Sequence, residues 1–222
     1  MFTTVTRKVK NLKPIERYRF KTTEHYWERR YQQGQLGGTE GAFDAIADFK
    51  SRFLNNFVKE NDVKSVIDFG CGDGCFLCYC RFPEYTGYEV SQSALRDCQE
   101  YFFLKYPQWQ FFDYRDYDGR QAELALSLDV IDYLVEDHTY IKHMRDLFAA
   151  ATRYVIIYSS DIDNVHNDDV EGVHVRQRKF TDWIADNVKD FVLKERFDGQ
   201  FNKSLNPNDF FVYERVAGVV QR

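Results

Sequence analysis

The sequence predicts an α/β protein: a doubly wound, seven-stranded, mostly parallel sheet with one antiparallel strand near the C-terminus and an N-terminal helical extension. Short apolar strands and amphipathic helices alternate from about residue 64 onward, as in sheets covered on both faces. A glycine-rich turn, Gly70 to Gly74, directly follows the first of these strands. The last two strands have no helix between them, so one of them is expected to run antiparallel.

The segment before the first strand predicts a tail, a helix, a flexible link and a second helix. Residues 1–13 have no periodic pattern, and residues 23–33 read as a helix that stops at Gly34. Four glycines lie between Gly34 and Gly41, and a helix with one apolar face is expected over residues 43–59. We therefore expect a single domain, in which residues 1–60 form a tail and a helical lid and residues 61–222 form the core.

The core elements follow from apolar runs and capping residues. Helices are expected from Ser91, as N-cap, to about Lys105, over residues 137–151, and over residues 180–188 with Thr181 as the N-cap. The glycine turn is also expected to open a helix, because the chain must cross back to the next strand. The strands are expected at residues 64–69, 84–90, 109–112, 123–128, 153–160, 191–197 and 209–220.

The composition excludes several functional classes. The 222 residues are 44% hydrophobic, which is enough for one large domain, and the formal net charge is −5. An acidic chain is a poor general binder of nucleic acid, so we expect no DNA partner. No apolar run approaches a membrane span, and the polar, basic N-terminus does not resemble a signal peptide. Five cysteines, four of them within residues 71–80, indicate reduced thiols, and we expect a cytoplasmic protein without a membrane partner.

The glycine turn predicts a nucleoside site. In a doubly wound sheet the ligand lies at the carboxyl ends of the strands, and the turn follows the first strand there. Glu89 ends the second strand 19 positions after Gly70, close to the spacing of ribose-binding carboxylates. A glycine turn with a carboxylate at this distance predicts a nucleoside or dinucleotide ligand whose ribose hydroxyls bind Glu89.

Four motifs resemble those of the class I S-adenosylmethionine-dependent methyltransferases. "SVIDFGCGDG" is similar to their first motif, "YTGYEVS" to their ribose motif, and "AELALSLDVIDYLVED" to their fourth-strand motif, while "YWERRY" resembles an N-terminal pattern of several small members. The resemblance implies S-adenosylmethionine as the cofactor. The cofactor-binding residues that it implies are Trp27, Arg30, Asp68, Gly70, Cys71, Gly72, Gly74, Glu89, Val90, Asp113, Asp129 and Val130.

The cofactor's chemistry suggests individual roles. Arg30 can pair with the methionine carboxylate in a bidentate fork. Asp113 or Asp116, just past the third strand, can accept the adenine amino group, and Asp68 and Asp129 are candidates near the methionine end.

The acceptor side is expected after strands four and five. Asp132 and Tyr133 follow strand four, and a long polar segment after strand five carries His166 and His174. His174 is our first candidate for a general base, with Asp132 and Tyr133 as further catalytic candidates. The adjacent prolines used on exocyclic base amines are absent, and the chain is small. We therefore expect a hydroxyl or amine of a small molecule or saccharide as acceptor.

Other functions stay open at this point. Cys71, Cys75 and Cys78 have the spacing of an iron–sulfur site, but small apolar fillers between helix and sheet explain Cys75, Cys78 and Cys80 better. A nicotinamide dehydrogenase would need glycine where Cys75 stands. We assign no metal ligand.

Three further alternatives concern the reaction itself. Mg²⁺ could be held by Asp129 with Asp161 or Asp163 and Asn164. The acceptor could be a protein, or the chain could be a non-catalytic partner subunit that retains the fold. The sequence leaves the acceptor atom and the oligomeric state undetermined.

Overall fold

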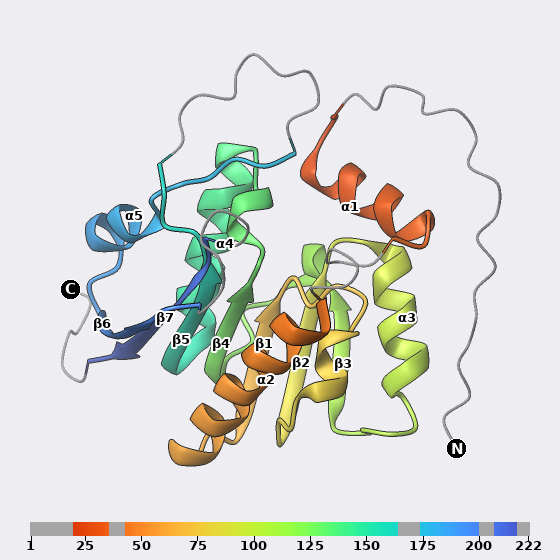
Figure 1. The fold of residues 1–222 in the computed structure, drawn as a ribbon, viewed down its shortest axis with the longest axis horizontal. Coiled ribbons are helices and arrows are strands. Elements are labelled where there is room, and N and C mark those ends of the chain that lie inside the picture. Colours follow the sequence, from red (N-terminus) through yellow and green to blue (C-terminus); the bar gives the residue numbers. More distant parts are fainter. Residues whose placement is uncertain (1–19, 36–42, 164–173, 200–206, 217–222) are drawn as a thin grey trace.

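The computed structural model describes residues 20–35, 43–163, 174–199 and 207–216, which form one seven-stranded sheet with helices on both faces (Figure 1). The strand order is β3-β2-β1-β4-β5-β7-β6. Only β7 runs antiparallel to its neighbours, β5 and β6, and the predicted fold class is confirmed. The strands are β1 (Ser65–Phe69), β2 (Glu84–Glu89), β3 (Trp109–Asp113), β4 (Ala122–Leu128), β5 (Ala151–Ser159), β6 (Phe191–Phe197) and β7 (Asp209–Arg215).

The α-helices form two layers and a cover. Helices α2 and α3 contribute to the hydrophobic cluster on one face of the sheet, and α4 and α5 to the cluster on the other. Helix α1 lies across the end of the sheet at which the parallel strands finish (Figure 1). The helices are α1 (Thr23–Gln32), α2 (Phe43–Glu60), α3 (Gln92–Phe102), α4 (Asp137–Ala150) and α5 (Phe180–Asn187), with 3₁₀ turns η1 (Phe76–Tyr79), η2 (Tyr114–Asp116) and η3 (Ile131–Tyr133).

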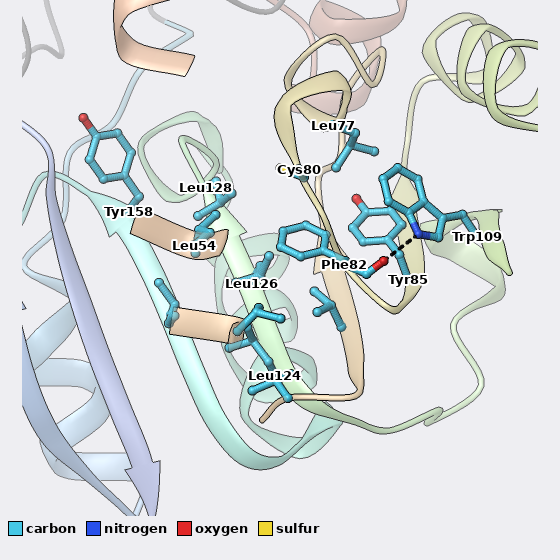
Figure 2. Packing of buried hydrophobic residues seen from close by; sticks show 14 of the residues in the cluster. Leu54, Leu77, Cys80, Phe82, Tyr85, Trp109, Leu124, Leu126, Leu128 and Tyr158 are labelled. Carbon is cyan, nitrogen blue, oxygen red and sulfur yellow. Dashed lines mark hydrogen bonds between the residues drawn. The ribbon is translucent and has the colours of Figure 1, made fainter. Parts of the chain in front are cut away.

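Alternating side chains of the strands build the two clusters. In β1, Val66 packs into the cluster under α2 and α3, whereas Ile67 and Phe69 pack into the cluster under α4 and α5. The first cluster is aromatic at the β2–β3 edge, where the Trp109 indole N–H donates to the Phe82 carbonyl oxygen at 3.2 Å (Figure 2). The buried indole therefore keeps a hydrogen-bond partner. No helix in the described ranges is both long enough and apolar enough to span a membrane.

Two capping predictions have different outcomes. Ser91 caps α3 as expected, since its side chain accepts from the Ala94 amide, although the helix ends at Phe102, earlier than expected. Thr181 is not the N-cap of α5, because the helix already begins at Phe180. Instead, the Thr181 amide donates to Asp161 Oδ1 at 3.2 Å, and its hydroxyl lies 2.8 Å from Asp161 Oδ2. Asp161, 20 positions earlier in the sequence, thus accepts a hydrogen bond from an amide of the first turn of α5, which has no partner within the helix.

The connection after the glycine turn is shorter than expected. Residues 75–83 must return the chain to β2 at Glu84, and they form the single 3₁₀ turn η1 where an α-helix was expected. Cys80 is buried, as expected of an apolar filler. Cys78 is exposed, so that prediction is wrong for it, because one 3₁₀ turn covers less of the sheet than an α-helix would.

Candidate functional site

A pocket opens at the carboxyl ends of β1, β2 and β4, beneath α1. This is the edge at which doubly wound sheets bind their ligands. The pocket brings together nine of the predicted cofactor-binding residues: Trp27, Asp68, Gly70, Cys71, Gly72, Glu89, Val90, Asp129 and Val130.

The glycine turn forms one wall of this pocket, and its glycines are required there. Gly70 and Gly72 have φ values of +93° and +61°, in the left-handed region. A Cβ on Gly70 would lie 2.5 Å from Val130 Cγ2, and one on Gly72 would lie 2.8 Å from the Tyr31 hydroxyl oxygen. The turn therefore lets α1 and the end of β4 approach the backbone closely.

Glu89 is buried at the end of β2 and is tied to the turn. Its Oε2 accepts from the Gly72 amide at 2.9 Å, and its Oε1 accepts from the amides of Val90 and Ser91, each at 2.9 Å. Burial raises the pKa of the carboxyl group, while these three backbone hydrogen bonds act in the opposite direction. Glu89 therefore fixes the shape of the turn as well as lining the pocket.

Asp68 ends in the floor of the pocket and is 2% exposed. Its Oδ2 accepts from the Tyr85 hydroxyl at 2.8 Å, whereas its Oδ1 is buried with no partner among the described residues. Burial raises the pKa of Asp68 to about 7. This carboxyl oxygen is therefore a buried acceptor without a donor, in a residue that lines the pocket.

Lys50 is a site residue that the sequence analysis missed. Its ammonium lines the pocket and lies 2.6 Å from Asp129 Oδ2. Asn208, from the segment that leads into β7, donates to Asp129 Oδ1 at 2.7 Å. The sequence signal is the position of Lys50 on the buried face of α2, between Ala47 and Leu54. A lysine on such a face rarely lacks a charged partner.

The inner end of the pocket also contains residues that the sequence analysis did not predict. Tyr114, Thr139 and His143 line it. His143 Nε2 lies 2.8 Å from the Ser127 hydroxyl oxygen, and burial lowers the pKa of this histidine to about 4. His143 is thus neutral near pH 7. We find no pattern in the sequence that would have distinguished it from an ordinary core residue of α4.

Helix α1 covers the pocket and is anchored at its start and near its middle. Near its start, the Thr23 amide donates to Glu136 Oε1 at 3.0 Å. Further along, Glu28 accepts from the Ser91 hydroxyl at 2.7 Å and from the Ser93 amide at 3.1 Å. The helix therefore bridges from the start of α4 to the start of α3 across the pocket.

An aromatic cluster adjoins the pocket through Trp27. The Trp27 ring lies edge-on to Tyr133, with centroids 4.9 Å apart, and also contacts Tyr26 at 5.3 Å. The His174 ring stacks on Tyr26, with centroids 4.3 Å apart and an interplanar angle of 16°. The Arg30 guanidinium donates to the Tyr26 hydroxyl oxygen at 3.2 Å. We name Tyr26, Trp27, Tyr133 and His174 the aromatic cluster.

Several predicted residues do not line the pocket. Arg30, Tyr133 and His174 belong to the surroundings of Trp27, as just described. Gly74 packs against α3, where a Cβ would lie 2.7 Å from Phe102. Asp113, at the end of β3, is bonded to Arg115, with Arg115 Nη2 2.6 Å from Asp113 Oδ2.

Asp132 also lies outside the pocket lining. Both of its carboxyl oxygens lie within 2.9 Å of the Ser160 hydroxyl oxygen. Burial raises its pKa to about 6, although the hydrogen bonds from Ser160 act to lower it. The structure thus places Asp132 next to Tyr133 in η3, bonded to Ser160 just after β5.

The described residues form no cluster of three or more side chains that could hold a metal ion. Asp161 is bonded to Thr181, and Asp129 is bonded to Lys50 and Asn208, so these two carboxylates do not converge as the Mg²⁺ alternative required. His166 and Asn164 lie outside the described residues.

The donor set of the pocket fits S-adenosylmethionine. This molecule carries a carboxylate, an ammonium, a ribose diol and an adenine. The pocket offers one ammonium, on Lys50, and a buried unsatisfied acceptor, on Asp68. It also offers the Glu89 carboxylate and apolar walls at Val90 and Val130. Each part of the molecule therefore has a complementary group.

Comparisons with known proteins agree with this fit. A family model described as a methyltransferase domain matches residues 39–191, whereas no curated protein matches. The fold is similar to that of a magnesium protoporphyrin IX methyltransferase from Synechocystis PCC 6803 solved with bound S-adenosylmethionine. The TM-score is 0.61 at 16% identity, over 86% of this chain and 90% of that chain.

Two other solved structures share the fold. An N-methyltransferase, NodS, from Bradyrhizobium japonicum WM9 has a TM-score of 0.58 at 15% identity, over 79% of this chain and 98% of that chain. Mitomycin 7-O-methyltransferase has a TM-score of 0.62 at 12% identity, over 88% of this chain and 61% of that chain. The family match covers more than half of the sequence, and the chain belongs to the methyltransferase-domain family as a class I S-adenosylmethionine-dependent methyltransferase.

Proposed function

We propose that the chain methylates a hydroxyl or amine group of a small molecule or saccharide unit that binds at the aromatic cluster. The observation that carries this proposal is the continuity between cofactor pocket and cluster: Trp27 lines the pocket and contacts both Tyr26 and Tyr133. Ring faces with polar tips bind planar rings and sugar faces well.

The pocket residues would hold the cofactor by its separate parts. Glu89 would accept from the ribose hydroxyls, and Val90 and Val130 would contact the adenine. Asp68 would receive the ammonium and Lys50 the carboxylate. When bound, S-adenosylmethionine supplies a methyl group on a sulfonium centre, and the protein's part is to position the acceptor and exclude water.

The aromatic cluster also offers groups for handling the acceptor's proton. His174 would act as the base, with its ring orientation fixed by stacking on Tyr26. Burial and the nearby Asp129 raise the pKa of Tyr133, so its phenol stays protonated and can donate a hydrogen bond. Asp132, bonded to Ser160, would support the loop that carries Tyr133.

A turnover screen tests the proposal. The full chain is incubated with S-adenosylmethionine and separate pools of phenols, sugars, small amines, a peptide mixture and RNA, and S-adenosylhomocysteine is quantified by mass spectrometry. Turnover with a small-molecule pool supports the proposal. Turnover with peptides or RNA alone contradicts it. Cofactor binding without turnover in any pool contradicts it too and favours the alternative of a non-catalytic subunit.

Variants then connect the turnover to the cluster. His174→Gln is expected to lower kcat and to change its pH profile, because the base is lost. Tyr133→Phe is expected to raise KM, since a phenol that binds the acceptor is removed. His138→Gln, at an exposed position of α4, is the matched control. Unchanged kinetics in both cluster variants would place the acceptor elsewhere.

A further inference from the structure

Asp68 combines burial, a pocket position and an unsatisfied oxygen. Only 2% of the residue is exposed, one oxygen accepts from the Tyr85 hydroxyl, and the other has no partner among the residues described. A charged carboxylate in such a place is costly, because water no longer solvates it. The cost of burying this carboxyl group falls if the group holds a proton and is neutral. It also falls if the ionised group gains a cation as a neighbour.

We propose that Asp68 exchanges a proton for the ammonium group of the cofactor. In the ligand-free protein the carboxyl holds its proton below neutral pH. When S-adenosylmethionine or S-adenosylhomocysteine binds, the O–H bond breaks, its electron pair stays on the carboxylate and the proton passes to the buffer. The inference rests on the cofactor of the family and does not depend on which acceptor is methylated.

The groups around Asp68 agree with a carboxyl that is neutral before binding. Burial raises its pKa to about 7, against the lowering effects of the Tyr85 hydrogen bond and the charge of Lys50, while Glu89 raises it further. Lys50 cannot serve fully as a counter-ion, since its ammonium lies 2.6 Å from Asp129 Oδ2.

Two thiols also face Asp68. Cys71 lies in the glycine turn and Cys80 follows η1, and each feels the charge of Asp68. The pKa of the Cys71 thiol is raised by a hydrogen bond with Cys98 and by burial, and the pKa of the Cys80 thiol is raised by burial. Both thiols stay neutral at pH 6–8, so neither adds a negative charge beside Asp68 or titrates in the range of the test.

The sign of the linkage follows from these groups. The ammonium favours the ionised carboxylate, so the pKa of Asp68 is lower in the complex than in the free protein. Binding therefore releases a proton at pH values between the lowered pKa in the complex and the free value of about 7. We expect close to one proton per ligand at pH 6, about 0.1 at pH 8, and an affinity about tenfold weaker at pH 6 than at pH 8.

Calorimetry tests the exchange without a methyl acceptor. S-adenosylhomocysteine is titrated into the full chain at pH 6 in two buffers of different ionisation enthalpy, and again at pH 8. The difference in observed enthalpy gives the protons released. Release near one at pH 6 that disappears at pH 8 is the expected result. Tight binding without any release at pH 6 overturns the proposal, whereas failure to bind at all contradicts the cofactor assignment itself.

Three variants assign the proton. Asp68→Asn is expected to abolish the release, because the amide does not titrate. Glu123→Gln is the control: this half-buried carboxylate lies at the start of β4, pairs with Arg153 outside the pocket lining, and should leave the release unchanged. Tyr85→Phe removes a bond that favours the ionised form and should extend the release to higher pH.

These variants also cover the case in which Asp68→Asn does not fold. Tyr85→Phe keeps the carboxyl and most of the buried volume, so its shift toward higher pH tests the assignment independently. Release that persists in a folded Asp68→Asn protein, or a Tyr85→Phe profile identical to that of the native protein, places the titrating group elsewhere and overturns the proposal.

Discussion

Lys50 and Asp129 form an ion pair at the pocket, with Nζ 2.6 Å from Oδ2, although 79 positions separate them in the sequence. Asp129 itself has a φ of +58°, an uncommon conformation for a residue other than glycine. Asn208 holds the second carboxyl oxygen at 2.7 Å. One carboxylate at the end of β4 is thus fixed from α2 and from the segment before β7, in a backbone conformation of the kind found at functional sites.

We predict that Lys50→Met weakens binding of S-adenosylmethionine by about tenfold to a hundredfold. An ammonium has three donors, and Asp129 takes one of them, so the cofactor's carboxylate can bind another. A hydrogen bond to a charged group contributes about 1.5–3 kcal/mol. Calorimetry measures the affinity, and thermal unfolding shows whether the variant is folded.

The control for this prediction lies on the same helix. Arg52 pairs with Asp48 on the exposed side of α2, so Arg52→Met removes a cation without touching the pocket, and its affinity should match the native value. Arg30→Ala in the same assay tests Arg30, the other candidate for binding the cofactor's carboxylate. A large loss with Arg30→Ala and none with Lys50→Met would reverse our assignment.

A second prediction concerns Glu89. We expect Glu89→Gln to weaken cofactor binding more than tenfold, because an amide cannot accept from the ribose hydroxyls and from three backbone amides as a carboxylate does. The matched control is Glu84→Gln, at the exposed start of the same strand. Calorimetry at pH 8 measures both. Native affinity in a folded Glu89→Gln protein would sink the ribose assignment.

The fold could be predicted from the sequence because its signals are local. Apolar runs bounded by turns gave all seven strands, and the absence of a helix between β6 and β7 predicted the antiparallel strand. Ser91 was recognised as a cap for the same reason, since it contacts an amide three residues away. The glycine turn and Glu89 could be found because their spacing follows from one strand, one turn and the next strand.

The remaining features depend on contacts between distant segments. Thr181 looked like a cap because nothing local shows that Asp161 reaches the start of α5. Lys50 occupies a core position on α2, and only the fold reveals Asp129 as its partner. The α-helix expected after the glycine turn was wrong because the length of the connection was misjudged. Residues 75–83 are apolar, but they are too few to form several helical turns and also return the chain to β2.

A third prediction uses the buried His143. Its pKa is lowered to about 4 by burial, whereas in the unfolded chain it titrates near 6.5, so the unfolded state binds more protons between these values. The stability provided by this residue is present above pH 6.5 and is lost as the pH falls toward 4. We expect its contribution to the free energy of unfolding to fall by about 2 kcal/mol from pH 7 to pH 5.

Urea unfolding of native protein and His143→Gln at both pH values tests this prediction. The native protein should lose about 2 kcal/mol more stability on acidification than the variant, whose side chain does not titrate. Carboxyl groups that titrate in the same range contribute equally to the stability loss of both proteins. Their contribution therefore cancels when one loss is subtracted from the other. His138→Gln, at an exposed position of α4, should behave as native. Equal losses in native protein and His143→Gln would mean that the imidazole is solvated.

The last prediction concerns α1 as a lid over bound cofactor. We expect S-adenosylhomocysteine to slow amide exchange in α1, because the helix covers the pocket with Trp27 and is anchored by Thr23 and Glu28. Most of the flexible link expected after this helix, residues 36–41, lies outside the described residues. Arg30→Ala tests the rival assignment: it should remove most of the protection only if Arg30, and not Lys50, binds the cofactor's carboxylate. Equal exchange with and without ligand would make α1 a fixed part of the scaffold.

The anchor at Glu28 gives this lid a pH dependence that can be measured without ligand. Burial acts to raise the pKa of Glu28, but hydrogen bonds from Ser91, Ser93 and Gln32 outweigh it and lower the pKa to about 2. The anchor is therefore complete above the usual value near 4.5 and weakens as the pH falls from there toward 2. Glu28→Gln should speed amide exchange in α1 at pH 7, once the intrinsic exchange rates are corrected for. It should also abolish the increase in α1 exchange that the native protein shows as the pH falls below 4.5. Glu100→Gln, exposed on α3, should change neither, and an unaltered α1 in Glu28→Gln would show that Thr23 alone holds the helix.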